Sequence, residues 1–266
     1  MSNGFNLKGC TVCTTGATGH LGSVLVRGLA AAGANLIITA RDAKRLEALR
    51  KEIENEGGQV EAFSCDISVA GQREHFAKEI LARVGRLDIL INNAHGGRPG
   101  PWYQSGEDDF AFAQTLAVTA PHDLIQRLLP LLKKGADARP GGASVINVSS
   151  MYGVVSPDPA IYGDSGLNSP PQYGAAKAGM VQLSRYLAVH LACHQIRVNS
   201  ITPGPFPRAE IQAEMPDFCT RLVDKVPLKR LGKPEELIGP VLFLASEASS
   251  FVTGTNLPVD GGWTAW

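Results

Sequence analysis

The sequence predicts an α/β fold in which one doubly wound, Rossmann-type parallel sheet of about seven strands carries helices on both faces. Short, almost continuously apolar runs alternate with longer amphipathic segments, as in a parallel sheet that is covered on both sides. No repeat, low-complexity tract or linker interrupts the 266 residues, so we expect a single domain over residues 1–266.

The expected strands are the apolar runs, which are rich in β-branched residues and short. In chain order they cover residues 9–15, 35–40, 60–64, 87–91, 143–148, 195–201 and 255–259. The expected helices are the longer segments, whose charged residues fall on one face. They cover residues 21–32, 43–56, 70–84, 108–134, 172–192 and 234–246, and Pro130 lies near the end of the fourth.

Composition excludes several classes of function. The chain has 25 basic and 25 acidic residues, so its net charge is zero and nothing steers it to nucleic acid or an anionic membrane. No apolar run could span a bilayer and no apolar signal core precedes the first strand, which predicts a cytoplasmic protein. Five scattered cysteines argue against disulfides. Cys10 and Cys13 fall in an apolar strand, so we expect buried thiols and no metal site.

A glycine-rich turn joins the first expected strand to the first helix. Gly16, Gly19 and Gly22 allow a tight turn and a close approach of the backbone to a pyrophosphate, while the helix start offers amide donors. Because this triplet follows a strand and opens a helix, it predicts a dinucleotide site. Thr18, His20 and Leu21, between the glycines, belong to the same expected site.

The end of the second expected strand indicates which dinucleotide binds. It runs Ala40-Arg41-Asp42, and Arg41 could grip a 2′-phosphate, which favours NADP. NAD is the alternative, because a shift of one residue would bring Asp42 to the ribose. The alternative interpretation of Arg41 is an ordinary solvated surface arginine that does not bind the cofactor.

Tyr173 and Lys177 stand four residues apart in an expected helix and so share one face. A lysine ammonium beside a phenol favours the phenolate, which predicts a tyrosine pKa lowered from about 10 towards neutral, where proton transfer is most useful. Alone, the pair equally fits two ordinary surface residues.

Taken together, these motifs resemble those of the short-chain dehydrogenase/reductase family, and the likeness runs nearly from end to end. The matching segments, in order, are the glycine loop at 15–22, Cys65-Asp66-Ile67, Asn92-Asn93-Ala94, Asn147-Val148-Ser149-Ser150, Tyr173 with Lys177, Arg197 to Gly204, and Val259 to Gly262. The resemblance implies a single-domain enzyme that uses a nicotinamide cofactor, acts on a small molecule and assembles as a homodimer or homotetramer.

The resemblance also implies catalytic roles. Ser150 would polarise the substrate carbonyl or alcohol, and Tyr173 would give or take its proton during hydride transfer. Lys177 would hold the nicotinamide ribose and lower the pKa of the tyrosine. Hydride transfer leaves charge on a substrate oxygen, and a serine hydroxyl, a tyrosine phenol and a lysine ammonium could together stabilise it.

Further residues are implied to hold the cofactor or to brace its site. Asp66 would bond the adenine amino group and Ile67 would pack against the ring, whereas Asn92 would brace the central strands. The remaining cofactor residues implied are Asn93, Ala94, Pro203, Gly204 and Phe206.

The chain departs from the family pattern in ways that concern the site. His95 stands after Asn93-Ala94, where the family usually has a glycine. The stretch Pro205 to Arg208 lacks the threonine that the family usually has there. Counting back from Pro130 places Ala117 where the family has an asparagine of the proton relay. The lysine would then reach solvent by another water path, or turnover would be slow.

The substrate is indicated by an insert at residues 156–171, which separates Ser150 from Tyr173 by more than the family's usual interval. It is rich in Asp, Ser, Asn, Tyr and Pro, and it resembles the equivalent segment of sugar-acid dehydrogenases. A subunit contact or rigid surface loop is the alternative. The expected substrate residues are His95, Arg98, Tyr152 and Asp164.

Three functions follow as hypotheses. The first is an oxidoreductase that uses NADP or NAD to interconvert a secondary alcohol and a ketone on a polar, sugar-like or sugar-acid substrate. The second is a reductase of the same fold for 3-ketoacyl or lipid-type carbonyls. The third, suggested by Ala117, is a weakly catalytic NADP-binding regulatory protein.

Overall fold

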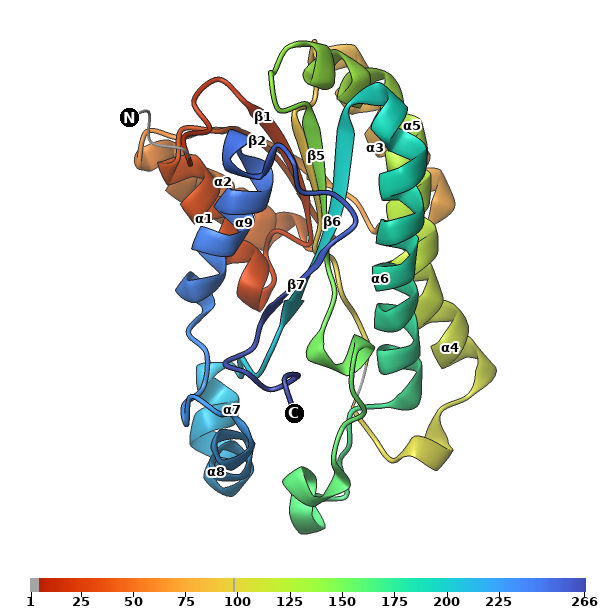
Figure 1. The fold of residues 1–266 in the computed structure, drawn as a ribbon, viewed down its shortest axis with the longest axis vertical. Helices are drawn as coiled ribbons and strands as arrows, with labels where there is room; N and C mark the ends of the chain where they lie inside the picture. The colour runs from red at the N-terminus through yellow and green to blue at the C-terminus, as the bar shows by residue number, and fades with distance from the viewer. Residues whose placement is uncertain (1–4, 98) are drawn as a thin grey trace.

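Seven parallel strands form one sheet in the computed structural model, which describes residues 5–97 and 99–266. The spatial order is β3-β2-β1-β4-β5-β6-β7, so the chain winds outward first to one side of β1 and then to the other (Figure 1). The strands are β1 (Thr11–Thr15), β2 (Asn35–Ala40), β3 (Gln59–Ser64), β4 (Ile89–Asn92), β5 (Ala143–Val148), β6 (Ile196–Pro203) and β7 (Asn256–Val259). The predicted doubly wound sheet is confirmed, and the winding reverses between β1 and β4, where ligands bind in such folds.

Helices cover both faces of the sheet, as predicted (Figure 1). One face carries α1 (His20–Ala31), α2 (Ala43–Asn55) and α9 (Ile238–Ala245), whose apolar residues share one buried cluster with the sheet. The other carries α3 (Ala70–Arg83), α4 (Glu107–Gln114), α5 (Ala120–Asp137) and α6 (Pro171–Leu191). Most boundaries lie within one or two residues of the prediction. The segment predicted as one helix at 234–246 starts with a 3-10 turn and continues as α9.

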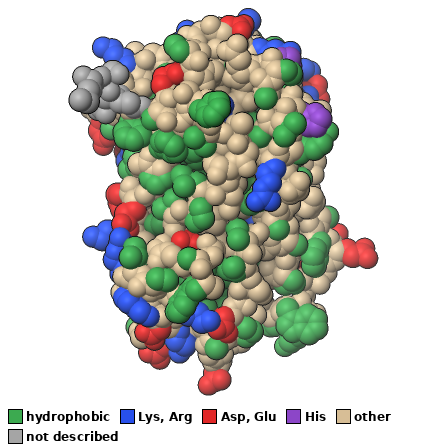
Figure 2. All heavy atoms as spheres, viewed as in Figure 1, with side chains coloured by type: hydrophobic (Ala, Val, Ile, Leu, Met, Phe, Trp, Pro, Cys, Tyr) green, Lys and Arg blue, Asp and Glu red, His purple; other side chains and the backbone are tan. Residues whose placement is uncertain are grey.

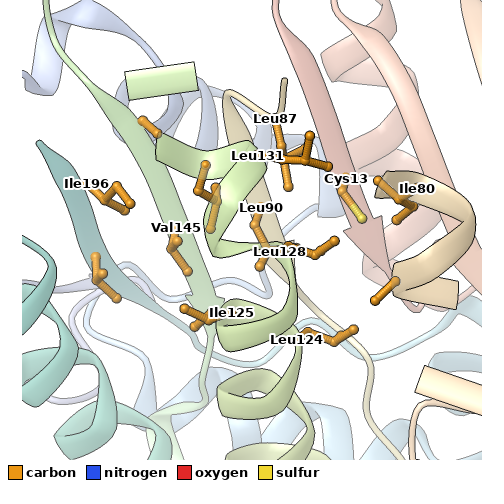
Figure 3. Close-up of a cluster of buried hydrophobic side chains, with 14 of the residues drawn as sticks. Cys13, Ile80, Leu87, Leu90, Leu124, Ile125, Leu128, Leu131, Val145 and Ile196 are labelled. Carbon is orange, nitrogen blue, oxygen red and sulfur yellow. The ribbon is translucent and has the colours of Figure 1, made fainter. Parts of the chain in front are cut away.

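The buried cluster beneath α5 shows why the sheet and helices hold together. Figure 3 shows Leu124 and Leu128 of α5 directed towards the strands, where Leu90 and Val145 complete the cluster. Each fully buried side chain of this size contributes roughly 1.5–3 kcal/mol. Cys13 lies in this cluster and Cys10 in the cluster on the opposite face, so the prediction of buried thiols is confirmed.

The fourth predicted helix was wrong in two respects. Residues 108–134 are not one helix but α4, a π-helical segment at Thr115–Thr119, and α5. Pro130 lies well inside α5, which continues to Asp137. A proline costs about 3 kcal/mol in a helix interior, but the apolar face of α5 is buried against the sheet and outweighs that cost.

Two helices were not predicted at all. They are α7 (Ala209–Glu214) and α8 (Pro216–Lys225), which follow β6 (Figure 1). Both are short, and prolines surround and interrupt the segment, so its periodicity is weak. In α8 only Cys219 and Leu222 are buried.

The surface agrees with the balanced composition. On the face drawn in Figure 2, acidic and basic side chains are interspersed and no large patch carries one sign of charge. Among the described helices, none has the length and apolarity that a membrane crossing requires.

Candidate active site

A cavity of about 360 Å³ opens beyond the carboxyl ends of β4, β5 and β6. It contains Ser150 and Tyr173 together, and Gly204 stands at its edge. Because parallel strands end at the same side of the sheet, residues that follow three different strands meet there. The remaining lining residues are His95, Gly96, Gly97, Pro99, Asp109, Phe112, Ala113, Met151, Tyr152, Tyr162, Asn168, Ser169, Pro170 and Gln172.

Ser150 and Tyr173 meet in this cavity, although 23 residues separate them, and the Ser150 hydroxyl acts to lower the pKa of the Tyr173 phenol. Ser150 follows β5 and its Oγ also accepts a hydrogen bond from the Tyr152 backbone N–H at 3.2 Å. Two glycines allow this turn to lie directly on α6. A Cβ on Gly153 would stand 2.8 Å from the Lys177 carbonyl carbon, and one on Gly174 would stand 2.7 Å from the Tyr152 carbonyl oxygen.

Lys177 is buried one helical turn from Tyr173. Its ammonium donates to the Val148 carbonyl at 2.6 Å, and its own carbonyl accepts a hydrogen bond from Ser149 Oγ at 2.9 Å. The end of β5 therefore holds the lysine at both its backbone and its side chain. Burial lowers the pKa of Lys177 to about 8.

The predicted low pKa of Tyr173 was wrong for the protein without cofactor. Burial raises the pKa of Tyr173 above its ordinary value, and the Ser150 hydroxyl offsets only part of that rise. Lys177 is not among the groups that shift this pKa, since its ammonium is directed to the Val148 carbonyl. In this state the phenol is therefore held protonated.

The depressed pKa of Lys177 predicts a stability difference with pH. Between about pH 8 and pH 10, the unfolded chain binds more protons at this lysine than the folded chain does, so raising the pH favours folding. The free energy of unfolding of the wild type, relative to Lys177→Met, should rise with a slope of up to about 1.4 kcal/mol per pH unit. Urea unfolding of both proteins without cofactor measures this, and parallel pH profiles would contradict it.

Ala117 lies in the π-helical segment and is buried against Ala176 and Met180 of α6. The position expected for a relay asparagine thus holds a methyl group beside the helix that carries Tyr173 and Lys177. That Lys177 reaches solvent by another path of waters, or that turnover is slow, stays a prediction.

The glycine loop is closed by contacts that leave no room for side chains. Gly16 has φ +66°, and a Cβ there would stand 2.6 Å from Ala94 Cα. A Cβ on Gly22 would stand 2.2 Å from the Gly16 carbonyl oxygen and 2.7 Å from Asn93 Nδ2. Asn93 Nδ2 itself donates to the carbonyls of Thr15 and Gly16. The loop after β4 therefore shapes the turn that leads into α1, whose N-cap is Gly19.

Other predicted cofactor residues surround this loop. His20 Nε2 lies 3.1 Å from the Phe206 carbonyl oxygen, which links α1 to the segment after β6. Pro203 ends β6, and a Cβ on Gly204 would stand 2.5 Å from Asp260 Cα. Their roles in binding stay predictions.

The acidic and apolar residues after β3 are already engaged within the protein. Asp66 Oδ1 accepts hydrogen bonds from both the backbone N–H and the hydroxyl of Ser68. Ile67 is buried in the core cluster that includes Phe76. The other carboxylate oxygen of Asp66 lies 4.0 Å from the Arg41 guanidinium.

The structure gives different surroundings to Arg41, Asp42 and Arg45, which follow β2. Arg41 is largely exposed and free to turn towards a ligand. Asp42 caps α2, because its Oδ1 accepts a hydrogen bond from the Arg45 backbone N–H at 3.0 Å. Arg45, which the sequence reasoning missed, donates through Nη2 to the Thr18 carbonyl of the glycine loop at 2.8 Å. Arg45 therefore joins the start of α2 to the glycine loop.

The insert at 156–171 is packed against α8. Arg221 Nε donates to the Ile161 carbonyl at 2.7 Å, and the rings of Tyr162 and Phe218 lie 5.4 Å apart. Asp158 also forms an ion pair with Lys225. These contacts turn one side of the insert towards the cavity.

The predicted substrate residues have different outcomes. His95 and Tyr152 line the cavity, and the His95 ring lies 4.8 Å from the Tyr173 ring. Asp164 is exposed and is not among the cavity residues, because the outer side of the insert carries it. Arg98 lies outside the described residues.

Charge and burial keep two cavity residues neutral. Although part of His95 is open to solvent, the surrounding protein, Lys177 and Arg208 lower its pKa to about 4. Burial raises the pKa of Tyr152, whose hydroxyl lies 3.4 Å from that of Tyr162. His95 and Tyr152 therefore present uncharged hydrogen-bonding groups to the cavity.

Three further cavity residues were missed by sequence reasoning: Tyr162, Asn168 and Gln172. The polar composition of the insert pointed to the first two without choosing among its members. Gln172 carried no signal beyond its place directly before Tyr173.

Comparison with known proteins places the chain in a family. A family model described as enoyl-(acyl carrier protein) reductase matches residues 16–264. The 3-oxoacyl-[acyl-carrier-protein] reductase FabG of Thermotoga maritima is 30% identical over 96% of this chain and 98% of its own length.

Two solved structures are similar over nearly all of both chains. The NADP complex of RhlG from Pseudomonas aeruginosa has a TM-score of 0.89 at 31% identity and covers 99% of this chain and 100% of its own. A gluconate 5-dehydrogenase from Burkholderia cenocepacia, in complex with NADP and tartrate, has a TM-score of 0.86 at 29% identity and covers 99% of this chain and 98% of its own. With the parallel sheet, the glycine loop and the Ser150, Tyr173 and Lys177 cluster, these matches show that the chain belongs to the short-chain dehydrogenase/reductase family of NAD(P)-dependent oxidoreductases.

Proposed function

We propose that this protein is an NADP-dependent oxidoreductase that interconverts a secondary alcohol and a ketone on a polar, sugar-like or sugar-acid substrate. The observation that carries the proposal is the meeting of Ser150 and Tyr173 in one cavity, whose wall also holds the polar side chains of Tyr152, Tyr162 and Asn168. The gluconate 5-dehydrogenase with bound NADP and tartrate supports the choice of substrate class.

The residues around the glycine loop fit a nicotinamide dinucleotide. The start of α1 directs amide donors towards a pyrophosphate, and the glycines leave the backbone bare where side chains would intrude. Arg41 and Arg45 would bind the 2′-phosphate, while Asp42 is held away as a helix cap. Pro203 and Gly204 would border the nicotinamide, which supplies or accepts the hydride when bound.

Side chains of the protein would carry out the proton transfer. The Ser150 hydroxyl would donate a hydrogen bond to the reacting oxygen, and the Tyr173 phenol would give its proton to that oxygen during ketone reduction. Because burial raises the pKa of Tyr173, the phenol starts protonated. Lys177 would bind the nicotinamide ribose, and its charge, brought towards the phenolate, would stabilise it after the proton has left.

Arg41→Ala is expected to weaken NADPH binding about 10- to 100-fold while changing NADH binding little, because it removes a charge-assisted contact to the 2′-phosphate. Fluorescence titration with both cofactors measures the ratio. Lys51→Ala, which removes an exposed charge from α2, the helix that follows Arg41, is the matched control. Unchanged NADPH affinity in Arg41→Ala would show that this arginine is only solvated.

A reductase for 3-ketoacyl or lipid-type carbonyls is the second candidate, and the similarity to FabG favours it. The polar side chains of Tyr152, Tyr162 and Asn168 in the cavity wall favour a polyhydroxylated substrate, whereas Phe112 and Met151 in the same wall would suit an alkyl chain. The intact Ser150, Tyr173 and Lys177 argue against a purely regulatory protein.

A substrate screen tests the proposal. Polyols, ketoses and sugar acids are compared with acetoacetyl-CoA and 2-hexanone, each with NADP(H) and NAD(H). We expect turnover of a polyhydroxylated compound with NADP(H). Turnover of the thioester alone would support the second candidate, and NADPH binding without any turnover would support the regulatory one.

A further inference from the structure

We propose that Ser149 is a positioning residue, which holds Lys177 of α6 where its ammonium can reach the Tyr173 phenol. The inference rests on the proposed function, because it names a residue that keeps the lysine in place for the proposed proton transfer. Ser149 is only 4% exposed and is not among the cavity residues, whereas its neighbour Ser150 is. Ser149 therefore acts through Lys177 and not by touching the substrate.

Ser149 joins three elements of the fold at one point. It directly follows β5, and its backbone N–H donates to the Ile201 carbonyl of β6 at 2.8 Å. Its hydroxyl donates to the Lys177 carbonyl of α6 at 2.9 Å. Side chains of consecutive residues in an extended chain point to opposite sides. Ser149 is accordingly turned to the helix, while Ser150 belongs to the cavity.

The end of β5 holds Lys177 by two hydrogen bonds, of which only one can last through the reaction. The ammonium donates to the Val148 carbonyl at 2.6 Å, and that contact must break when the lysine turns to the nicotinamide ribose. The bond from the Ser149 hydroxyl to the lysine carbonyl can stay. A lysine side chain is long and flexible, so a fixed backbone limits the positions that its ammonium can take.

The helix does not need this bond for its own hydrogen bonding. The Lys177 carbonyl lies inside α6, where it accepts the regular helical bond from the N–H four residues further on. Alanine in place of Ser149 would therefore leave no buried donor or acceptor without a partner, and the loss of such a bond costs little stability. We infer that the bond serves the position of α6 more than the stability of the core.

The fit between α6 and the turn after β5 makes that position important. A Cβ on Gly153 would stand 2.8 Å from the Lys177 carbonyl carbon, so the turn that carries Ser150 lies directly on the helix that carries Tyr173. A displacement of α6 changes the distances among the reacting groups. A misplacement of about 1 Å can lower a rate about 100-fold.

Ser149→Ala tests the assignment on the protein with NADP+ bound. If the ammonium moves away from the phenol, the pKa of Tyr173 should rise above its value in the wild-type complex, because a nearby positive charge favours the phenolate. Ultraviolet difference titration at saturating NADP+ measures this pKa, with the spectrum of the same protein carrying Tyr173→Phe subtracted. Alcohol oxidation needs the phenolate, so kcat for oxidation should fall about 10- to 100-fold and its pH profile should move to higher pH.

A double variant shows whether Ser149 acts through the lysine. The other titratable groups around the phenol are His95 after β4, Tyr152 after β5, Tyr162 of the insert, and Arg208, which is close to His95. All of them are kept in the variants. In a Lys177→Met background, Ser149→Ala should leave the pKa of Tyr173 unchanged, because the ammonium that it positions is gone. A further rise would mean that Ser149 acts by another route and would refute the assignment.

Ser184 offers a matched control on the same helix, two turns beyond Lys177. Its hydroxyl is fully buried and accepts a hydrogen bond from Asn147 Nδ2 of β5 at 2.8 Å. Ser184→Ala leaves that amide without its acceptor, so Tm should fall further than in Ser149→Ala, where the loss should stay below about 6 °C. The pKa of Tyr173 and kcat should nevertheless stay as in the wild type. Equal changes in pKa and kcat in both variants, or none in either, would overturn the proposal.

Two further substitutions separate the hydrogen bond from the space that the side chain fills. Ser149→Cys keeps nearly the same volume but offers only a weak donor, so it should resemble Ser149→Ala, and it serves in its place if the alanine variant does not fold. Ser149→Thr keeps the hydroxyl and should bring the pKa of Tyr173 back to the wild-type value. A cysteine variant with the wild-type pKa would show that packing, and not the hydroxyl, positions the helix.

The titration of the phenol needs no substrate, which separates this inference from the proposed function. Rates are measured with D-sorbitol, D-gluconate and 2-hexanol as probes, each with NADP+. If the wild type oxidises none of them, the proposed reaction fails on these probes, and the titration alone still decides the role of Ser149. If the wild type oxidises a polyhydroxylated probe and Ser149→Ala keeps the wild-type pKa and kcat, the positioning role is refuted and the proposed reaction stands.

Discussion

Replacing Tyr173 by phenylalanine is expected to lower kcat about 10²- to 10⁴-fold, which is the range that a positioned general acid contributes. The phenol lies beside Ser150 in the cavity and would be the proton donor for the reacting oxygen, so its removal takes that donor away. The ring remains, and its contact with His95 is preserved. NADPH affinity and Tm should therefore change little.

Steady-state rates and a cofactor titration measure both parts of this prediction. Tyr186→Phe is the matched control, because Tyr186 lies on the same helix but is 57% exposed. The pH profile adds a second readout. The wild type should lose ketone reduction as pH rises through the pKa of the phenol, and the residual activity of Tyr173→Phe should not follow that profile. A variant that retains a large part of the wild-type kcat would remove Tyr173 from the chemistry.

Replacing Gly22 by alanine is expected to weaken NADPH binding at least about 10-fold and to lower stability by about 1–3 kcal/mol, as overpacking does in a close-packed interior. The new Cβ would stand 2.2 Å from the Gly16 carbonyl oxygen, which belongs to the backbone of the phosphate loop and has no flexible side chain to move aside. The loop must open, and the amides at the start of α1 then lose their arrangement around the pyrophosphate.

Gly71→Ala is the control for the general effect of a glycine substitution. Gly71 lies in the first turn of α3, and a Cβ there would meet no atom within 4 Å. Alanine should therefore stabilise the protein by up to about 1 kcal/mol and leave NADPH affinity unchanged. Equal NADPH affinity in Gly22→Ala and the wild type would mean that the pyrophosphate does not bind at this loop.

Local patterns predicted most of the fold. Every strand and most helices were predicted correctly, because the spacing of apolar residues along a short segment indicates whether it is a buried strand or a helix. The errors occurred where contacts between distant segments decided the outcome. The predicted helix at 108–134 is divided by a π-helical segment into α4 and α5, and α7 and α8 were missed because their short segments have little periodicity of their own.

The candidate site shows the same division. Spacing alone paired Tyr173 with Lys177. The glycine loop was recognised from its three glycines, and the structure shows close backbone contacts that leave little room for side chains there. The sequence did not correctly predict whether the pKa of Tyr173 is raised or lowered. That direction depends on burial and on the Val148 carbonyl that attracts the lysine ammonium, and neither follows from helical spacing.

The sequence by itself determined the fold class, the phosphate loop and the pairing of Tyr173 with Lys177, because each rests on short-range periodicity or on a short motif, and the family resemblance added Ser150. Only the tertiary structure decided which side of the insert faces the cavity. Asp164 is exposed and does not line the cavity, whereas Asn168 and Gln172 do. The reason is physical: the packing of the insert against α8 sets its orientation, and such a contact between distant segments leaves no periodic trace in the sequence.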